Sequence, residues 1–167
     1  MQKNKINLTK VLLVIYCVLI VWIILFKLSF SIADFIGLDK SRSINLIPFY
    51  YDNETNFHFK EVISNLLVFV PFGIYLKILD KDNKEIFLYG FIFSLALEIS
   101  QFIFKLGAAD ITDLLTNTVG AAIGVLGYIL LEKIFKKKEK INKVLRILSL
   151  IATILICLML LLLLAFN

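Results

Sequence analysis

The chain is poor in the side chains that most metal and nucleophilic sites require. It has one histidine, two cysteines and two prolines among 167 residues. His58 has no second His or Cys nearby, so a surface position is favoured over a ligand role. Cys17 and Cys157 each lie inside an apolar run, which gives neither a disulfide framework nor a metal-ligand spacing. No nucleophile motif and no phosphate-binding signature occurs, which argues against the common hydrolase and nucleotide sites.

Charge is also scarce. Charged residues make up 19% of the chain, hydrophobic residues make up 60%, and the mean hydropathy is +0.90. Soluble domains are typically about 45–50% apolar, so this composition indicates a membrane protein. The net charge of +5 could suggest a nucleic-acid partner. However, the basic residues fall in short connections rather than on one continuous patch, so we interpret them as topology signals and expect membrane lipids, not nucleic acid, as partners.

Long apolar runs predict an all-α integral membrane protein, a bundle of five transmembrane helices in a single membrane domain. About 20 apolar residues at 1.5 Å each cover a hydrocarbon core of about 30 Å. The first run is too long for a signal peptide, so we expect it to be retained. The expected helices are residues 11–33, 62–79, 86–104, 110–131 and 147–166.

Two features of these runs predict packing. Pro71 lacks a backbone donor and should kink the second helix, which membrane bundles tolerate. Gly120, Gly124 and Gly127 form a small-residue face on the fourth helix, of the kind that lets another helix approach closely.

One long polar loop, residues 34–61, is expected between the first two helices. Its stretch 45–51 contains Asn45 and Pro48, and it is too short to span a membrane and too apolar to be comfortably solvated. We therefore expect this stretch to be re-entrant or interfacial and to press against the bundle.

The most informative segment is residues 98–124, where polar side chains interrupt apolar helices. Glu98 and Gln101 are spaced i,i+3, while Asp110, Asp113 and Asn117 are spaced i,i+3,i+7, so each set lines one helical face. A carboxylate in hydrocarbon costs a few kcal/mol, and such residues indicate a functional site. Helix capping is the alternative explanation for the two aspartates at the start of the fourth helix.

Basic residues in short connections predict the orientation. One side receives Lys3, Lys5, Lys10, Lys77, Lys81, Lys84 and the basic segment 132–146, which is expected to be a connector between the fourth and fifth helices. That side is expected to be cytoplasmic, with the N-terminus inside and the C-terminus outside a bacterial cell membrane. The polar residues, together with Asn65, then converge at the outer leaflet, where the Pro48 stretch could cover them.

Four ordered motifs, at about residues 44–132, resemble the VanZ-like family of small bacterial membrane proteins. The motifs are Asn45-Leu46-Ile47-Pro48-Phe49; Asn65 followed by Pro71-Phe72-Gly73; Ser94 with Glu98 and Gln101; and Asp110 with Asp113, Asn117, Thr118 and Gly120. Many members carry an arginine shortly before the first aspartate of the last motif. This chain has Leu106-Gly107-Ala108-Ala109 there, and Lys105 is a poorer substitute. The expected helices at residues 11–33 and 147–166 flank this core.

The resemblance implies an association with low-level resistance to teicoplanin-type glycopeptides. It suggests an outward site that binds a lipid-linked or cell-wall group, and a cell-wall precursor or the glycopeptide itself is a candidate partner. The expected site residues are Asn45, Pro48, Asn65, Glu98, Gln101, Asp110, Asp113 and Asn117. The alternatives are a transporter or proton relay and an intramembrane enzyme. In the enzyme, Glu98, Asp110 and Asp113 would act as an acid/base pair or hold a divalent cation, although no cofactor signature is present.

Overall fold

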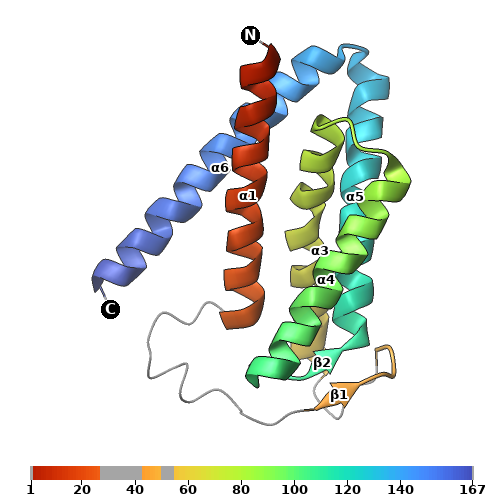
Figure 1. The fold of residues 1–167 in the computed structure, drawn as a ribbon, viewed down its shortest axis with the longest axis vertical. Coiled ribbons are helices and arrows are strands. Elements are labelled where there is room, and N and C mark those ends of the chain that lie inside the picture. Colours follow the sequence, from red (N-terminus) through yellow and green to blue (C-terminus); the bar gives the residue numbers. More distant parts are fainter. Residues whose placement is uncertain (1, 27–42, 50–54, 167) are drawn as a thin grey trace.

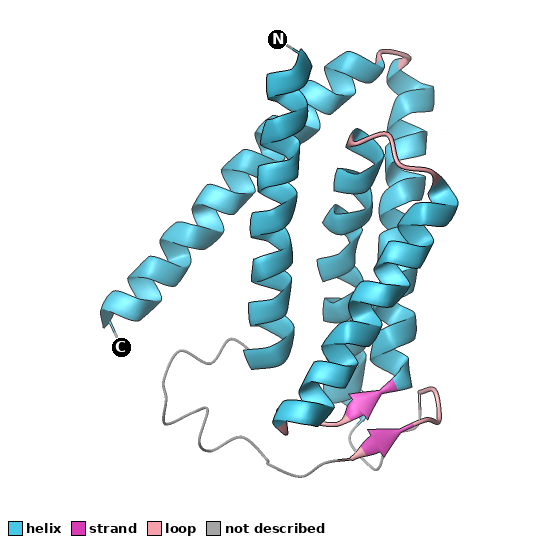
Figure 2. Cartoon of the chain, in the orientation of Figure 1, coloured by secondary structure: helices cyan, strands magenta, loops and turns pink. Residues whose placement is uncertain are grey.

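The computed structural model describes residues 2–26, 43–49 and 55–166. The described part contains five helices and two very short strands (Figures 1 and 2). The elements are α1 (Gln2–Phe26), β1 (Ile44–Asn45), α3 (Thr55–Ile78), α4 (Asn83–Phe104), β2 (Ala109–Asp110), α5 (Ile111–Phe135) and α6 (Lys138–Phe166).

Four helices are long and apolar enough to cross a membrane, judged on the described residues. The apolar stretches are Ile6–Leu25, Phe59–Ile78, Asn83–Phe104 and Ile111–Phe135. The expected helices at residues 62–79, 86–104 and 110–131 are thereby confirmed. The first is confirmed as far as Phe26, since residues 27–33 lie outside the described part. The fifth crossing falls on the far half of α6, where most side chains are not described, and it stays a prediction.

The basic segment 132–146 was expected to be a connector, and this expectation was wrong. It ends α5 and forms the first turns of α6, so that only Lys136 and Lys137 join the two helices. Lys, Glu and Arg have good helix propensity, and the segment has no glycine or proline to stop a helix. Lys136 turns the chain by adopting a left-handed conformation at φ 51°.

The closest helix pair is α3 with α5, and two of the three predicted glycines explain it. A Cβ atom at Gly120 would overlap the backbone carbonyl of Leu66, and one at Gly124 would overlap that of Val70. Gly73 of α3 is equally tight against Ala121 of α5. Since only hydrogen fits at these positions, the two backbones are in direct contact.

The prediction for Gly127 was wrong, because a Cβ atom there would meet nothing within 4 Å. Gly127 lies one turn beyond the close approach and is half-buried.

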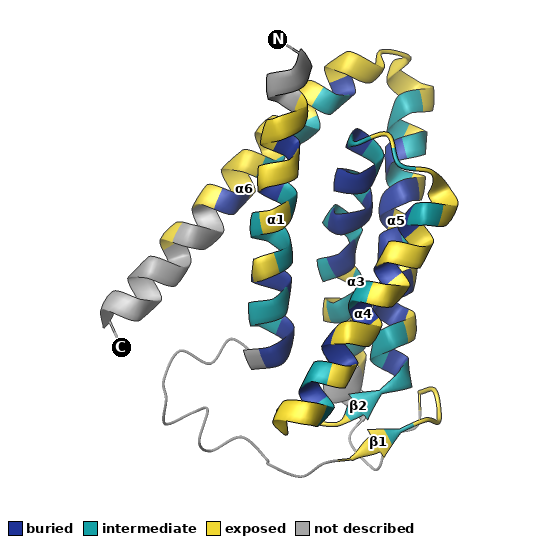
Figure 3. Cartoon of the chain, viewed as in Figure 1, coloured by how far each residue is buried: buried dark blue, intermediate teal, exposed yellow. Residues whose placement is uncertain are grey.

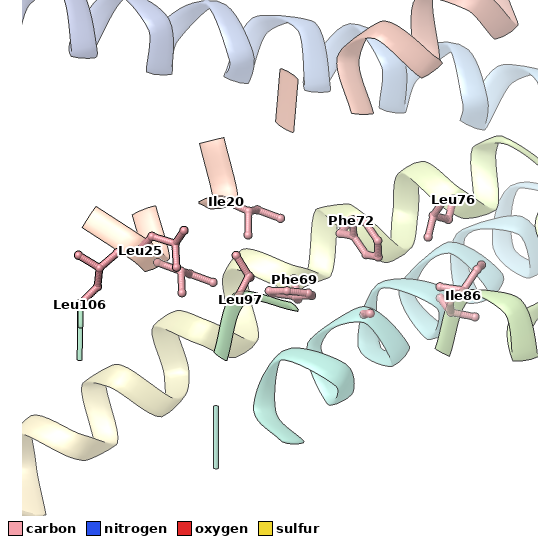
Figure 4. Close-up of a cluster of buried hydrophobic side chains, with 11 residues drawn as sticks. Ile20, Leu25, Phe69, Phe72, Leu76, Ile86, Leu97 and Leu106 are labelled. Atoms are coloured by element: carbon pink, nitrogen blue, oxygen red, sulfur yellow. The ribbon is translucent and has the colours of Figure 1, made fainter. Parts of the chain in front are cut away.

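The apolar core joins α1, α3, α4 and α5. Phe69 and Phe72 of α3 both contact Phe93 of α4, with the Phe72 ring stacked on it and the Phe69 ring tilted. Ile20 of α1 belongs to the same buried cluster as Phe69 and Phe72 (Figure 4). Pro71 is accommodated inside α3, whose helix continues through it. Buried positions concentrate where these helices face one another, while their outward faces are exposed apolar surface, as expected for contact with lipid (Figure 3).

The two ends of the bundle differ in character. The N-terminus and the α3–α4 and α5–α6 connections lie at one end, with the basic residues (Figure 1). The opposite end carries β1 and β2, which pair in parallel with Ile44 opposite Ala109 and Asn45 opposite Asp110. The sequence did not indicate these strands. Each is only two residues long, and the pairing joins segments 65 residues apart, so no local periodicity could reveal it.

Candidate functional site

Asp110 is the centre of the polar network at the strand end of the bundle. It is the last residue of β2 and the N-cap of α5, where its Oδ1 accepts a hydrogen bond from the backbone N–H of Thr112 at 2.7 Å. Its Oδ2 accepts another from the side-chain amide of Asn45 at 3.1 Å. Capping is therefore one role of Asp110, as the alternative explanation held, and the same carboxylate also ties β1 to the bundle.

Glu98 joins α4 to this network. Its Oε2 accepts the backbone N–H of Asp110 at 2.8 Å, although Glu98 is only 4% exposed. A backbone donor next to the N-terminus of α5 is thus satisfied from the neighbouring helix. The second oxygen, Oε1, is buried, and no described residue donates a hydrogen bond to it. A buried acceptor of this kind costs about 1–3 kcal/mol unless a partner satisfies it.

The segment after β1 folds over the start of α5. The backbone N–H of Phe49 donates to Thr112 Oγ1 at 3.1 Å, and the N–H of Ile47 donates to Asn45 Oδ1 at 3.2 Å. Phe49 has φ 58°, a conformation that bulky residues adopt only when their surroundings hold them in it. Pro48 lies within this turn and is exposed. The segment therefore packs on the end of the bundle and presents apolar side chains outwards.

The remaining predicted residues do not all belong to this network. Asn117 of α5 is fully buried and donates from Nδ2 to Ser94 Oγ of α4 at 2.9 Å. Gln101 is also buried, but it donates to the carbonyl of Ile24 at 3.2 Å and so joins α4 to α1. Asn65 is half-buried on α3. Asn117 and Gln101 thus connect helices within the bundle.

Two buried residues that hydrogen-bond to the predicted residues or to the segment after β1 were missing from the predicted site. Thr112 is fully buried and holds the Phe49 backbone, and Ser94 is fully buried against Asn117. Both stand inside the recognised motifs, since Thr112 lies between Asp110 and Asp113, and Ser94 precedes Glu98 by one helical turn. Because of that spacing, Ser94 lies on the same face of α4 as Glu98, and this could have identified it from the sequence.

The site is acidic. Asp113, Asp110 and Glu61 carry carboxylates close enough to interact electrostatically with Glu98. Neither Glu98 nor Asp110 forms an ion pair with a described basic side chain. Lys105 is exposed and takes the left-handed C-cap position of α4, at φ 57°. The described residues provide no group of three or more His, Cys, Asp or Glu side chains that could hold a metal ion.

An apolar pocket of about 240 Å³ opens beside this network, between β1, α4 and α5. Glu98 and Asp110 are the two charged residues among those that line it, although its surface is almost wholly apolar. The rest of its wall is apolar, made by Ile44, Leu46, Leu95, Ile99, Phe102, Ala109, Ile111 and Leu114. Because Leu95 and Ile99 belong to the exposed outer face of α4, the pocket is continuous with the surface that faces lipid.

A buried acidic network at one end of a helical bundle, beside a pocket open to lipid, defines the chain as a polytopic membrane protein with a polar site. The chain belongs to the VanZ/LLP1 family, whose model matches residues 13–135. This match includes most of α1, and so reaches beyond the motifs at 44–132. Protein VanZ from Enterococcus faecium is 39% identical over 137 residues, which cover 79% of this chain and 80% of the relative. No solved structure matches the chain.

Proposed function

We propose that this protein lowers susceptibility to teicoplanin-type glycopeptides by binding a lipid-linked or cell-wall group at the Glu98–Asp110 network. The observation that carries the proposal is the buried Glu98 Oε1, which lacks a donor among the described residues and belongs to a residue that lines an open apolar pocket. Membership of the family that includes Protein VanZ supports the link to glycopeptides.

The chemistry of the site favours a head group rich in hydrogen-bond donors. When its carboxylate is ionised, Glu98 only accepts hydrogen bonds, so Oε1 would then take an N–H or O–H from the ligand. With several carboxylates nearby and no described cation paired with Glu98, an amine or a set of hydroxyls matches the site in charge.

The pocket supplies the second half of the recognition. Its apolar wall can accept part of an acyl chain through van der Waals contacts, because lipid tails and this wall are equally apolar. A molecule with a polar head and a hydrocarbon tail would therefore place the head at Glu98 and the tail between α4 and the Leu46 side of β1. Because the pocket opens on the surface that faces lipid, a lipid-linked molecule could enter it from the bilayer in this orientation.

The proposed site is accessible to an envelope ligand only if the strand end of the bundle faces outwards. In a variant with Cys17 and Cys157 replaced by alanine, a cysteine at exposed Lys105 should react with a membrane-impermeant thiol reagent added to intact cells. A cysteine at Lys137 should react only after the cells are opened, because the basic end is expected to be cytoplasmic. The reverse pattern would place the site in the cytoplasm and contradict the proposal.

Blocking the pocket tests the function directly. Ile99→Trp should fill the pocket and abolish the protection that the wild-type protein gives a susceptible Gram-positive host, measured as the minimal inhibitory concentration of teicoplanin. Ile92→Trp is the matched control, since Ile92 lies two turns earlier on α4 and is similarly exposed (52%, against 49% for Ile99) but does not line the pocket.

Both variants should reach wild-type abundance, because the substituted side chains face lipid. Full protection by Ile99→Trp at normal abundance would show that the pocket has no part in the function.

A further inference from the structure

A second cavity lies at the opposite, basic end of the bundle. It has a volume of about 850 Å³ and is bounded by α1, by the end of α3 and by the first turns of α6. Five basic side chains line it, against the two acidic ones of Asp80 and Glu139. The basic residues are Lys137, Lys138, Lys140, Lys143 and Arg146.

The cavity keeps an excess of positive charge. Asp80 is engaged by Lys138, whose Nζ donates to its carboxylate, and this hydrogen bond raises the pKa of Lys138. Lys143 is exposed, and Arg146 is half-buried with its Nε on the carbonyl of Asn142. The remaining guanidinium N–H groups of Arg146 are well suited to bind a phosphate, because they form a planar fork.

An apolar pocket of about 320 Å³ follows directly along the same three helices. Tyr16 of α1, together with Pro71 and Ile74 of α3, forms one side. The other side comes from α6, through Leu145, Leu148, Ser149, Ala152 and Thr153. Arg146 and Ser149 are one turn apart, so the basic cavity and the apolar pocket meet along α6. Figure 1 shows that α6 leaves the end of α5, crosses α1 and then diverges from the rest of the bundle.

We propose that the cleft between α1, α3 and α6 is a binding site for an anionic glycerophospholipid of the leaflet at the basic end, with its phosphate at Lys143 and Arg146 and an acyl chain in the Tyr16–Thr153 pocket. The basic cavity suits an anionic head group, and the apolar pocket beside it suits a hydrocarbon chain. A lipid carries these two groups next to each other, in the same order. Basic pockets between transmembrane helices on the cytoplasmic side bind anionic lipid head groups in other membrane proteins.

Two simpler explanations make different predictions. Positive charge that only sets membrane topology would act wherever it lies in the connection, and need not line a cavity. A free phosphate compound would use Lys143 and Arg146 but would have no need of the apolar pocket. Only a lipid should respond to changes in both parts of the cleft.

The test is lipid binding to the purified full-length chain, measured by native mass spectrometry with phosphatidylglycerol as the anionic probe. Lys143→Gln/Arg146→Gln should bind phosphatidylglycerol about tenfold more weakly, because each basic side chain near an anionic surface contributes several-fold to affinity. Lys133→Gln/Lys136→Gln removes the same charge from neighbouring positions that do not line the cavity, and should change the affinity less than twofold.

Ala152→Phe, which fills the apolar pocket, should also weaken phosphatidylglycerol binding. Glycerol 3-phosphate should not displace the lipid, and phosphatidylethanolamine should bind more weakly than phosphatidylglycerol. If the two charge-removing variants weaken binding equally, or if glycerol 3-phosphate competes at stoichiometric concentration, the proposal is wrong. Lys143→Gln alone, at an exposed position, replaces the double variant if that protein does not fold.

Discussion

Gly124→Leu should remove most of the folded protein from the membrane. The Gly124 Cα lies against the carbonyl of Val70, and a Cβ there would overlap that oxygen and crowd the backbone N of Ile74. Neither backbone atom can rotate away as a side chain could, so α3 and α5 must separate along their whole contact. Overpacking of a core typically costs about 1–3 kcal/mol, a large part of the stability of a small protein.

The measurements are abundance in the membrane and melting temperature in detergent. Gly124→Ala should already lower both, since the first added carbon makes the clash. Gly127→Ala is the control on the same helix three residues on, where a Cβ meets nothing within 4 Å, and it should leave both values unchanged. A normal melting temperature for Gly124→Leu would mean that α3 and α5 do not meet as described.

The helices could be predicted from the sequence because their signal is local. Apolar runs between charged turns define α3, α4 and α5 to within a few residues, apart from the α3 start and the α5 end. The tight contact at Gly120 and Gly124 followed from their spacing. The surface of α3 that α5 contacts could not be predicted, because nothing in the sequence pairs Gly73 with Ala121. The start of α6 was misplaced because charged residues were read as a connection, although lysine-rich segments form helices readily.

The site could be predicted as a set of residues but not as a network. The i,i+3 spacing placed Glu98 and Gln101 on one face of α4, and that face is buried. An aspartate at the expected start of a helix indicated that Asp110 could be a cap. What the sequence could not show is that β1 lies beside β2, which brings Asn45 to the Asp110 carboxylate. Nor could it show that Glu98 accepts the backbone N–H of Asp110, a donor twelve residues later and on another element.

That contact makes Glu98 both structural and a candidate for ligand binding, and two substitutions separate the roles. Glu98→Gln retains a side-chain oxygen that can accept the Asp110 N–H, and should cost only about 1 kcal/mol, the difference between a charged and a neutral hydrogen bond. Glu98→Leu leaves that buried N–H without its acceptor, which costs about 1–3 kcal/mol. The corresponding Asp110→Asn is less informative, because its new amide would face the Asn45 amide.

We therefore expect Glu98→Gln to reach near-normal abundance and melting temperature and still to lose protection against teicoplanin, since it cannot offer a charged acceptor at the pocket edge. Glu98→Leu should lose both stability and protection. Glu132→Gln makes the same chemical change near the opposite end of α5 and should alter neither. The contrary result would be that protection survives Glu98→Gln and is lost, together with abundance, in Glu98→Leu. Glu98 would then only support the backbone of Asp110, and the ligand would have to be held by other groups.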